Sequence, residues 1–93
     1  VQSAIEPPKQ MLELSGSLME RMKSLIETTN TQLHSDLAVA AITTRAAAHN
    51  AACNIRINVP LLPENQRQST LDHTESLLDT IDELCKHTEK ACR

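Results

Sequence analysis

The sequence predicts an all-α fold of three antiparallel helices, part of a larger helical bundle that another chain or a further segment completes. Apolar residues recur at three- and four-residue steps in three segments, which is the spacing of one helix face. The 93-residue chain has one glycine and no Phe, Tyr or Trp. Its core must therefore consist of aliphatic side chains and alanine, which favours close helix contacts and packing against a partner.

The first predicted helix begins after Pro7 and Pro8, because the N–H that proline lacks would be unpaired in a first helical turn. Residues 28–31 compete for backbone hydrogen bonds and end the helix. Gly16 is expected to permit a close helix contact, at about 1 kcal/mol relative to alanine. The expected buried stripe consists of Met11, Leu14, Leu18, Met22, Leu25 and Ile26.

The second predicted helix starts near Ser35 or Asp36, both favourable N-cap residues. It continues through an alanine-rich segment to about Asn58 and is stopped by Pro60. The alternating pattern of residues 55–59 also fits a strand, but no other segment offers a pairing partner. Apolar residues surround most of this helix, so we expect it to be central and the most buried.

The third predicted helix follows Pro63 and Glu64 and carries a seven-residue repeat. Such a repeat is typical of a helical bundle or coiled-coil seam. Charged residues are expected on its outer face. The seam consists of Leu71, Thr74, Leu78, Ile81, Cys85, Thr88 and Cys92, widened by Leu77 and Leu84.

The composition argues against several classes of partner. The formal net charge is −3, from nine basic and twelve acidic residues, and no aromatic side chain is available for base stacking. We therefore expect no nucleic acid partner. No apolar run approaches the ~18 residues of a membrane span, so no membrane partner is expected. Three cysteines without a C-x-x-C motif indicate reduced thiols in a cytoplasmic or organelle-matrix protein, and we predict a cytoplasmic one.

Polar side chains stand at both ends of the second predicted helix. Asp36 either caps the helix, where its dipole favours a carboxylate, or also points into a pocket. Asn54 and Asn58 are four residues apart and share one helix face. Amides among apolar residues need a partner in a turn, a neighbouring helix or a ligand. Arg56 points elsewhere on a regular helix, and its planar fork suits a carboxylate or phosphate.

Histidine and cysteine positions suggest no metal centre. His49 and Cys53 have a four-residue spacing that metals use, but no third or fourth ligand follows at a suitable spacing. We therefore interpret both as ordinary helix-face or packing residues and expect no metal. His34, beside the start of the second helix, has a side chain of the type that titrates near neutral pH. Its position alone does not make it an acid or a base.

Two motifs together carry a resemblance to a known family. The segment HSDLAVAA, residues 34–41, precedes a small-residue helix that ends in ACNIRIN, residues 52–58. They resemble the Ser-Asp-x-x-Val-Ala and Asn-Val-x-Ile-Asn motifs of the cyclodeaminase / methenyltetrahydrofolate cyclohydrolase family, which includes the C-terminal domain of formiminotransferase-cyclodeaminase. Ile55 replaces the usual valine. The segment AIEPP, residues 4–8, is also similar to that family's entry into the preceding helix.

The resemblance spans nearly all of the chain but only about the second half of the family's domain. The glycine-rich opening segment of the family does not occur in the sequence, nor does the aromatic that some members carry before Asn-x-x-x-Asn. We therefore expect residues 1–93 to form a single, partial cyclodeaminase-like helical domain that needs its other half.

The resemblance implies a dimeric helical domain that acts on a one-carbon folate. Cyclodeaminases convert formimino-tetrahydrofolate to methenyl-tetrahydrofolate and release ammonia, whereas cyclohydrolases hydrolyse methenyl- to formyl-tetrahydrofolate; the sequence leaves both open. The implied acid/base is Asp36, positioned by Ser35. Asn54 and Asn58 would hold polar groups of the folate, and Arg56 would meet a carboxylate. A tetrahydrofolate derivative is the expected substrate, and a homo- or hetero-oligomer the expected assembly.

Distance along the second helix limits these roles. Asp36 and Asn54 are 18 residues apart, or ~27 Å on a straight helix. One chain cannot bring them together, whereas two antiparallel copies of the helix can. We expect either two separate roles or a composite site between chains. The alternatives are a non-catalytic helical assembly module derived from this fold, and an unrelated helical bundle.

Overall fold

The computed structural model describes residues 2–28 and 33–92, and this part of the chain forms three long helices and no strand. The helices are α1 (Gln2–Thr28), α2 (His34–Asn58) and α3 (Glu64–Ala91). A short 3-10 helix, η2 (Val59–Leu61), joins α2 to α3. The predicted all-α fold of three helices is confirmed.

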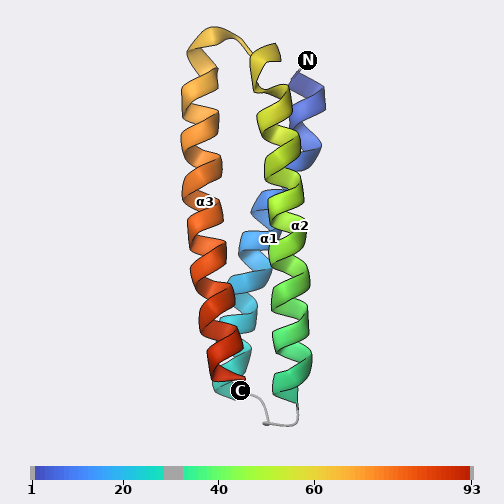
Figure 1. The fold of residues 1–93 in the computed structure, drawn as a ribbon, viewed down its shortest axis with the longest axis vertical. Helices are drawn as coiled ribbons and strands as arrows, with labels where there is room; N and C mark the ends of the chain where they lie inside the picture. Colours follow the sequence, from blue (N-terminus) through green and yellow to red (C-terminus); the bar gives the residue numbers. More distant parts are fainter. Residues whose placement is uncertain (1, 29–32, 93) are drawn as a thin grey trace.

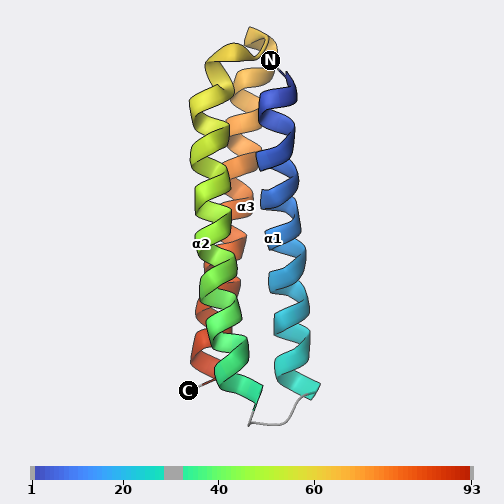
Figure 2. The same ribbon diagram turned by 90° about the vertical axis from the view of Figure 1, so that its right-hand side faces the viewer.

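The three helices lie side by side in an elongated bundle with principal extents of 48, 17 and 16 Å (Figure 1 and Figure 2). The chain runs along the bundle in α1, returns in α2 and runs back in α3 (Figure 1). Consequently α1 and α3 point in the same direction, and α2 points in the opposite one. The two ends of α2 lie at opposite ends of the molecule, which decides how far apart its polar residues are.

The start of α1 differs from the prediction, because Pro7 and Pro8 lie inside the helix rather than before it. Each proline removes one backbone donor from the helix. One turn earlier, Ile5 is only 3% exposed and belongs to the same core cluster as Val59 and Leu62. Burial of this side chain offsets the lost backbone hydrogen bonds and explains why the helix extends in front of the prolines.

Most residues of the stripe predicted to be buried on α1 lie on an exposed face of that helix. Met22 is buried as predicted, and Ile26 is half-buried. The residues of α1 that face the core lie mostly one position after those of the predicted stripe. They are Ile5, Leu12, Ser15, Gly16 and Met19. Four residues of the predicted stripe are between 40% and 55% exposed, namely Met11, Leu14, Leu18 and Leu25. The helix therefore has two apolar faces, and only one of them packs against the other described helices.

The bounds of α2 agree with the prediction at its end and differ at its start. The helix continues to Asn58, and Pro60 lies in η2. It begins at His34, with Leu33 in the N-cap position and no side-chain hydrogen bond to the cap. The predicted N-cap role of Ser35 or Asp36 is therefore wrong, because both residues already lie within the first helical turn.

One face of α2 packs against the other helices, and the opposite face is exposed. The buried face is formed by small residues and one isoleucine, which are Ala41, Ala48, Ala51, Ala52 and Ile55. On the other side Val39 is 64% exposed, Ile42 51% and Ile57 73%. The prediction that α2 is the most buried helix is wrong for this chain, because these three large apolar side chains of α2 are each more than half exposed.

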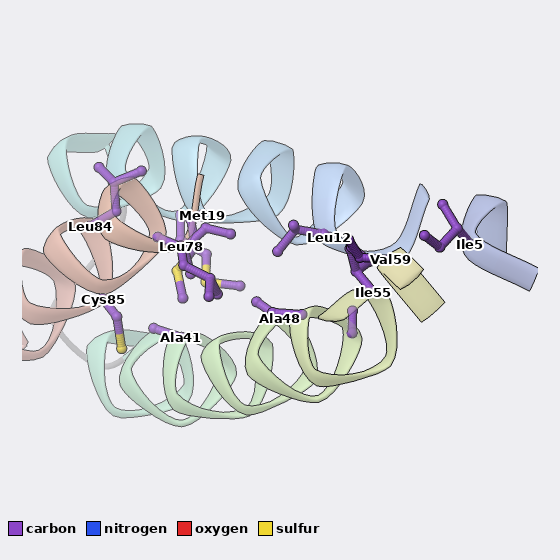
Figure 3. Packing of buried hydrophobic residues seen from close by; sticks show 14 of the residues in the cluster. Ile5, Leu12, Met19, Ala41, Ala48, Ile55, Val59, Leu78, Leu84 and Cys85 are labelled. Carbon is purple, nitrogen blue, oxygen red and sulfur yellow. The ribbon is translucent and has the colours of Figure 1, made fainter. Parts of the chain in front are cut away.

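The seam predicted on α3 is confirmed in its central part. Its buried residues are Thr74, Leu78, Ile81, Leu84, Cys85 and Thr88. Figure 3 shows Leu78 and Leu84 of α3 meeting Met19 of α1 in the core. The two buried hydroxyls need partners, and they donate to backbone carbonyls one turn earlier: Thr74 to Thr70 at 2.8 Å and Thr88 to Leu84 at 2.9 Å.

Candidate functional site

A groove of about 320 Å³ lies between the first half of α1 and the second half of α2. Its wall is mostly apolar but includes three amides, a combination typical of sites for small organic molecules. The residues that line the groove are Ala4, Pro7, Pro8 and Met11 from α1, and Ala47, Asn50, Ala51, Asn54 and Asn58 from α2.

The three amides form a ladder along one side of α2. Asn50, Asn54 and Asn58 follow each other at four-residue steps, so their side chains lie one above the other on the helix. The side-chain nitrogen of Asn58 donates to the backbone oxygen of Asn54 at 2.8 Å. Among the described residues, no hydrogen bond engages the side-chain amides of Asn50 and Asn54. These two amides are free to bind a ligand in the groove.

The sequence predicted two of the three groove amides, Asn54 and Asn58, but not Asn50. Asn54 and Asn58 were expected to share a helix face, and both line the groove. Asn50 lies one turn before Asn54 and lines it too. The four-residue spacing of Asn54 and Asn58 also includes Asn50, which lies just before the ACNIRIN motif.

Arg56 lies on a different side of α2, facing α3. Its guanidinium donates from Nε and Nη2 to one oxygen of Glu75, with the Nε contact at 3.1 Å. The hydrogen bonds that Arg56 donates to Glu75 are the main reason that the pKa of Arg56 is raised. The structure therefore does not bring Arg56 together with Asn54 and Asn58. As expected for its type, this arginine meets a carboxylate, but the carboxylate belongs to its own chain.

Ser35 and Asp36 lie at the far end of α2 from the groove. Both side chains are exposed in the first turn of the helix, where the helix dipole favours the carboxylate of Asp36. Because α2 is one continuous helix, the 18 residues from Asp36 to Asn54 correspond to ~27 Å. One copy of the chain therefore holds the candidate acid/base and the candidate amides apart.

A second polar cluster connects α2 to α3 on the side away from the groove. One carboxylate oxygen of Asp82 accepts a hydrogen bond from Nε of Arg45 and lies 2.8 Å from Nε2 of His49. Partial burial alone would raise the pKa of Asp82, but the hydrogen bonds with His49 and Arg45 together outweigh it and lower this pKa. Asp82 thus connects α3 to Arg45 and His49 of α2 through polar contacts.

The cysteines are all free and differ in their surroundings. Cys53 is exposed on α2, whereas Cys85 is buried in the core. The Cys85 thiol donates to a carboxylate oxygen of Glu89 at 3.2 Å. Burial, assisted by this hydrogen bond, raises the pKa of Cys85 to about 11. A thiol with this pKa is protonated at neutral pH and is a weak nucleophile.

Residues 2–28 and 33–92 contain neither a metal-binding cluster nor a membrane-spanning helix. Within these ranges, no three His, Cys, Asp or Glu side chains lie close enough together to hold a metal ion. None of the described helices combines the length and the apolarity that crossing a bilayer requires.

The chain is a small all-helical protein with an amide-lined, mostly apolar groove between α1 and α2. The profile of the formiminotransferase-cyclodeaminase family matches residues 1–90, essentially the whole chain. The chain therefore belongs to the formiminotransferase-cyclodeaminase family, which acts in folate one-carbon metabolism. The resemblance inferred from residues 34–41 and 52–58 is confirmed. No curated protein and no solved structure matches the chain significantly.

Proposed function

We propose that this chain acts in formimino-tetrahydrofolate cyclodeamination or methenyl-tetrahydrofolate cyclohydrolysis, together with surfaces outside the chain. The observation that carries the proposal is the ladder of Asn50, Asn54 and Asn58 along an apolar groove. Membership of the formiminotransferase-cyclodeaminase family supports a folate as the ligand.

The chemistry of the groove matches the pterin part of a folate. A pterin ring carries hydrogen-bond donors and acceptors along its edge, and an asparagine amide offers both. The apolar wall formed by Pro7, Pro8, Met11 and the alanines suits the flat faces of the ring. A volume of about 320 Å³ is at the low end for ligand sites. The groove therefore accommodates the ring system, while the glutamate tail extends beyond it.

Both reactions pass through a tetrahedral carbon that carries nitrogen. In the cyclodeaminase, folate N10 attacks the formimino carbon on N5, and protonation allows ammonia to leave. In the cyclohydrolase, water attacks the methenyl carbon, loses a proton, and the bond from that carbon to N5 breaks. Each reaction needs a group that accepts and returns a proton, and Asp36 is the proposed acid/base, positioned by Ser35.

The distances within one chain limit where these groups act. Because Asp36 lies ~27 Å along α2 from Asn54, the proposed site is composite, with Asp36 supplied by another copy or chain in an oligomer. The proposed role of Arg56 is to meet a folate carboxylate. This role requires Arg56 to exchange its present partner, Glu75, for the glutamate tail.

The proposal is tested by titrating the purified protein with 5-formyl-tetrahydrofolate and by following loss of methenyl-tetrahydrofolate absorbance. We expect Asn50→Ala and Asn54→Ala each to weaken binding about fivefold, because a ligand hydrogen bond contributes roughly 1 kcal/mol. Gln68→Ala is the matched control, because this amide lies on α3 and bonds Asp72 instead. Ammonia release from formimino-tetrahydrofolate would distinguish the deaminase from the hydrolase.

The second candidate function is a non-catalytic helical assembly module. The exposed aliphatic residues on α1 and α2, such as Leu14, Val39 and Ile57, favour it. In that case no folate binds, and Asn54→Ala lowers assembly rather than ligand affinity. Retention of helicity and assembly in Asn54→Ala, with loss of ligand affinity, would contradict this second function.

A further inference from the structure

Two prolines inside α1 change the backbone at one end of the amide-lined groove. In a regular α-helix a carbonyl accepts a hydrogen bond from the N–H four residues later, or three residues later where the helix tightens. For the carbonyl of Ala4 these positions are Pro8 and Pro7, and neither has an N–H. The Ala4 carbonyl therefore has neither of the donors that a helix normally supplies.

This carbonyl belongs to the side of α1 that lines the groove. Ala4, Pro7 and Pro8 are spaced as neighbours on one helix face, and all three line the groove. Helix carbonyls point towards the C-terminal end, so the Ala4 oxygen is directed towards the two prolines. Because a proline ring crowds the carbonyl four residues earlier, we expect this oxygen to tilt away from the helix axis. The α1 wall of the groove thereby gains a hydrogen-bond acceptor.

A second acceptor lies on the α2 wall. The side-chain nitrogen of Asn58 donates to the backbone oxygen of Asn54 at 2.8 Å. Because this bond uses the amide nitrogen, the side-chain oxygen of Asn58 keeps its capacity to accept. No donor to this oxygen is found among residues 2–28 and 33–92. Asn58 thus presents an acceptor, whereas Asn50 and Asn54 present both a donor and an acceptor.

The two acceptors lie at the same end of the groove. α1 and α2 run in opposite directions, so the start of α1 lies beside the end of α2 (Figure 1 and Figure 2). Ile5 and Val59, the residues that follow Ala4 and Asn58, are buried in the same core cluster. Each acceptor therefore stands one residue before a side chain of that cluster, on opposite walls of the groove.

We propose that the backbone oxygen of Ala4 and the side-chain oxygen of Asn58 form an acceptor pair that binds a primary amino group on the ring of the ligand. An amino group carries two N–H donors, so it donates to both walls at once. A ring carbonyl at this place would meet two oxygens and be rejected. The acceptor pair stands on the prolines and on the Asn58 contact; only the assignment of the amino group to a pterin rests on the proposed function.

The acceptor pair gives the ring one direction in the groove. A pterin carries its amino group on the pyrimidine half, whereas N5, the nitrogen that takes part in both proposed reactions, belongs to the other half. With the amino group at Asn58, the half that bears N5 points along α2 towards Asn50, two helical turns or ~12 Å away. Asn58 therefore orients the ring, and Asn50 lies nearer its reacting half.

Two ligands that differ only in the amino group test the acceptor pair by calorimetric titration. The unmodified protein should bind 5-formyl-tetrahydrofolate about 25-fold more tightly than its 2-desamino analogue, because each of two hydrogen bonds contributes about fivefold. Pro8→Val supplies an N–H to the Ala4 carbonyl and keeps an aliphatic side chain of similar size in the wall. This preference should then fall to about fivefold. Asn58→Leu removes the other acceptor and should cause the same fall.

Two further variants of the groove are the matched controls. Pro7→Val replaces the neighbouring proline, but its new N–H serves the carbonyl of Ser3 rather than that of Ala4. Asn50→Ala removes an amide from the other end of the groove. Both should keep the preference of the unmodified protein, whatever their effect on the affinity itself. An unchanged preference in Pro8→Val and Asn58→Leu, or an equal loss in Pro7→Val, would overturn the proposal.

Hydrogen exchange tests the released carbonyl without any ligand. In Pro8→Val the new amide proton at position 8 should be protected from exchange, because the Ala4 carbonyl is free to accept it. The same variant should also melt at a higher temperature, since a helix-breaking residue is removed from α1. If the amide at position 8 exchanges as fast as in an unfolded chain, the Ala4 carbonyl is not available and the proposal is wrong.

A ring fragment separates this inference from the proposed function. If the unmodified protein binds no folate, the proposed function fails, and 2-aminopyrimidin-4-one then probes the acceptor pair directly by NMR. Shifts at Ala4 and Asn58 with this fragment, but not with pyrimidin-4-one and not in Pro8→Val, would support the acceptor pair on its own. Absence of shifts at both residues at millimolar fragment concentrations would overturn it.

Discussion

The carboxylate of Asp82 on α3 lies 2.8 Å from Nε2 of His49 on α2, and the same oxygen accepts a hydrogen bond from Arg45. His49 and Arg45 are four residues apart, so both side chains extend from one side of α2. Next to this cluster, α2 meets the core through alanines, which contribute little buried area each. The polar cluster therefore adds specific contacts where the apolar contacts are small.

Asp82→Asn should weaken the bundle in a pH-dependent manner. Because the pKa of Asp82 is lowered in the folded state, its stabilisation is complete above about pH 5 and is lost as the pH falls through the folded-state pKa. We expect a loss of about 0.5–1 kcal/mol at pH 7, since the cluster is partly exposed. The difference from the unmodified protein should shrink towards pH 3.

Urea denaturation at pH 7 and pH 3 measures this effect. Asp79→Asn is the control, because Asp79 is an exposed carboxylate of α3 without an ion pair to the described residues. It should change the free energy of unfolding by less than about 0.5 kcal/mol. An equal loss in both variants, or a loss that persists undiminished at pH 3, would contradict the role of the Asp82 cluster.

The fold could be predicted wherever one helix face is apolar and the other is charged. On α3, Leu78, Ile81 and Cys85 are buried, as the seven-residue repeat indicates. The other faces of α3 carry charged residues and therefore cannot enter the core. On α1 the pattern is ambiguous, because Leu12 and Met19 form a second apolar row one residue beyond Met11 and Leu18. Periodicity cannot tell which row meets the chain's own core.

The candidate site could be predicted in part, for a similar reason. The four-residue spacing of Asn54 and Asn58 fixes their common side of α2, and the groove lies there. The sequence could not show that Arg56 is bonded to Glu75, because this pairing depends on how α2 and α3 align. It also could not place Pro7 and Pro8 in the groove wall, because that requires the helix to extend in front of them.

Gly16→Ala tests the close contact between α1 and α3. A methyl group at this position would lie 3.2 Å from Cδ1 of Leu77, so that side chain must move by a few tenths of an ångström. Leu77 is half-buried and has room to shift. The gain of about 1 kcal/mol in helix propensity should therefore exceed the packing cost, leaving a net stabilisation of roughly 0.5 kcal/mol.

A double-mutant cycle separates the two contributions. In a Leu77→Ala background the contact is gone, so Gly16→Ala should give its full propensity gain of about 1 kcal/mol. Denaturant unfolding of the four proteins supplies the measurement. If Gly16→Ala destabilises the protein equally with and without the Leu77 side chain, the contact with Leu77 does not constrain position 16.

The thiols of Cys53 and Cys85 should differ strongly in reactivity. The pKa of Cys85 is about 11 and its side chain is buried, so at pH 8 only about one thiol in a thousand is ionised. Cys53 is exposed. Timed alkylation with iodoacetamide, followed by peptide mass spectrometry, should label Cys53 long before Cys85.

The pH dependence of the alkylation is the internal check. Labelling of Cys85 should rise about tenfold per pH unit between pH 8 and 10 while the protein stays folded, as its thiolate fraction grows. Glu89→Gln removes the neighbouring charge and should increase the labelling, since the hydrogen bond and charge of Glu89 both raise this pKa. Equal labelling rates of the two thiols at pH 8 would contradict the buried position of Cys85.

Ala48→Leu should destabilise the bundle because α2 approaches α1 and α3 through its alanines. Ala48 is fully buried, and Figure 3 shows it across from Leu12 of α1. Added side-chain carbons have no free space there, so we expect a loss of about 1–3 kcal/mol in the free energy of unfolding.

Ala46→Leu is the matched control, because the exposed Ala46 lies two residues away on the same helix. It should not destabilise the chain in denaturant unfolding. Equal tolerance of leucine at both positions would mean that α2 lies further from α1 than its buried alanines indicate.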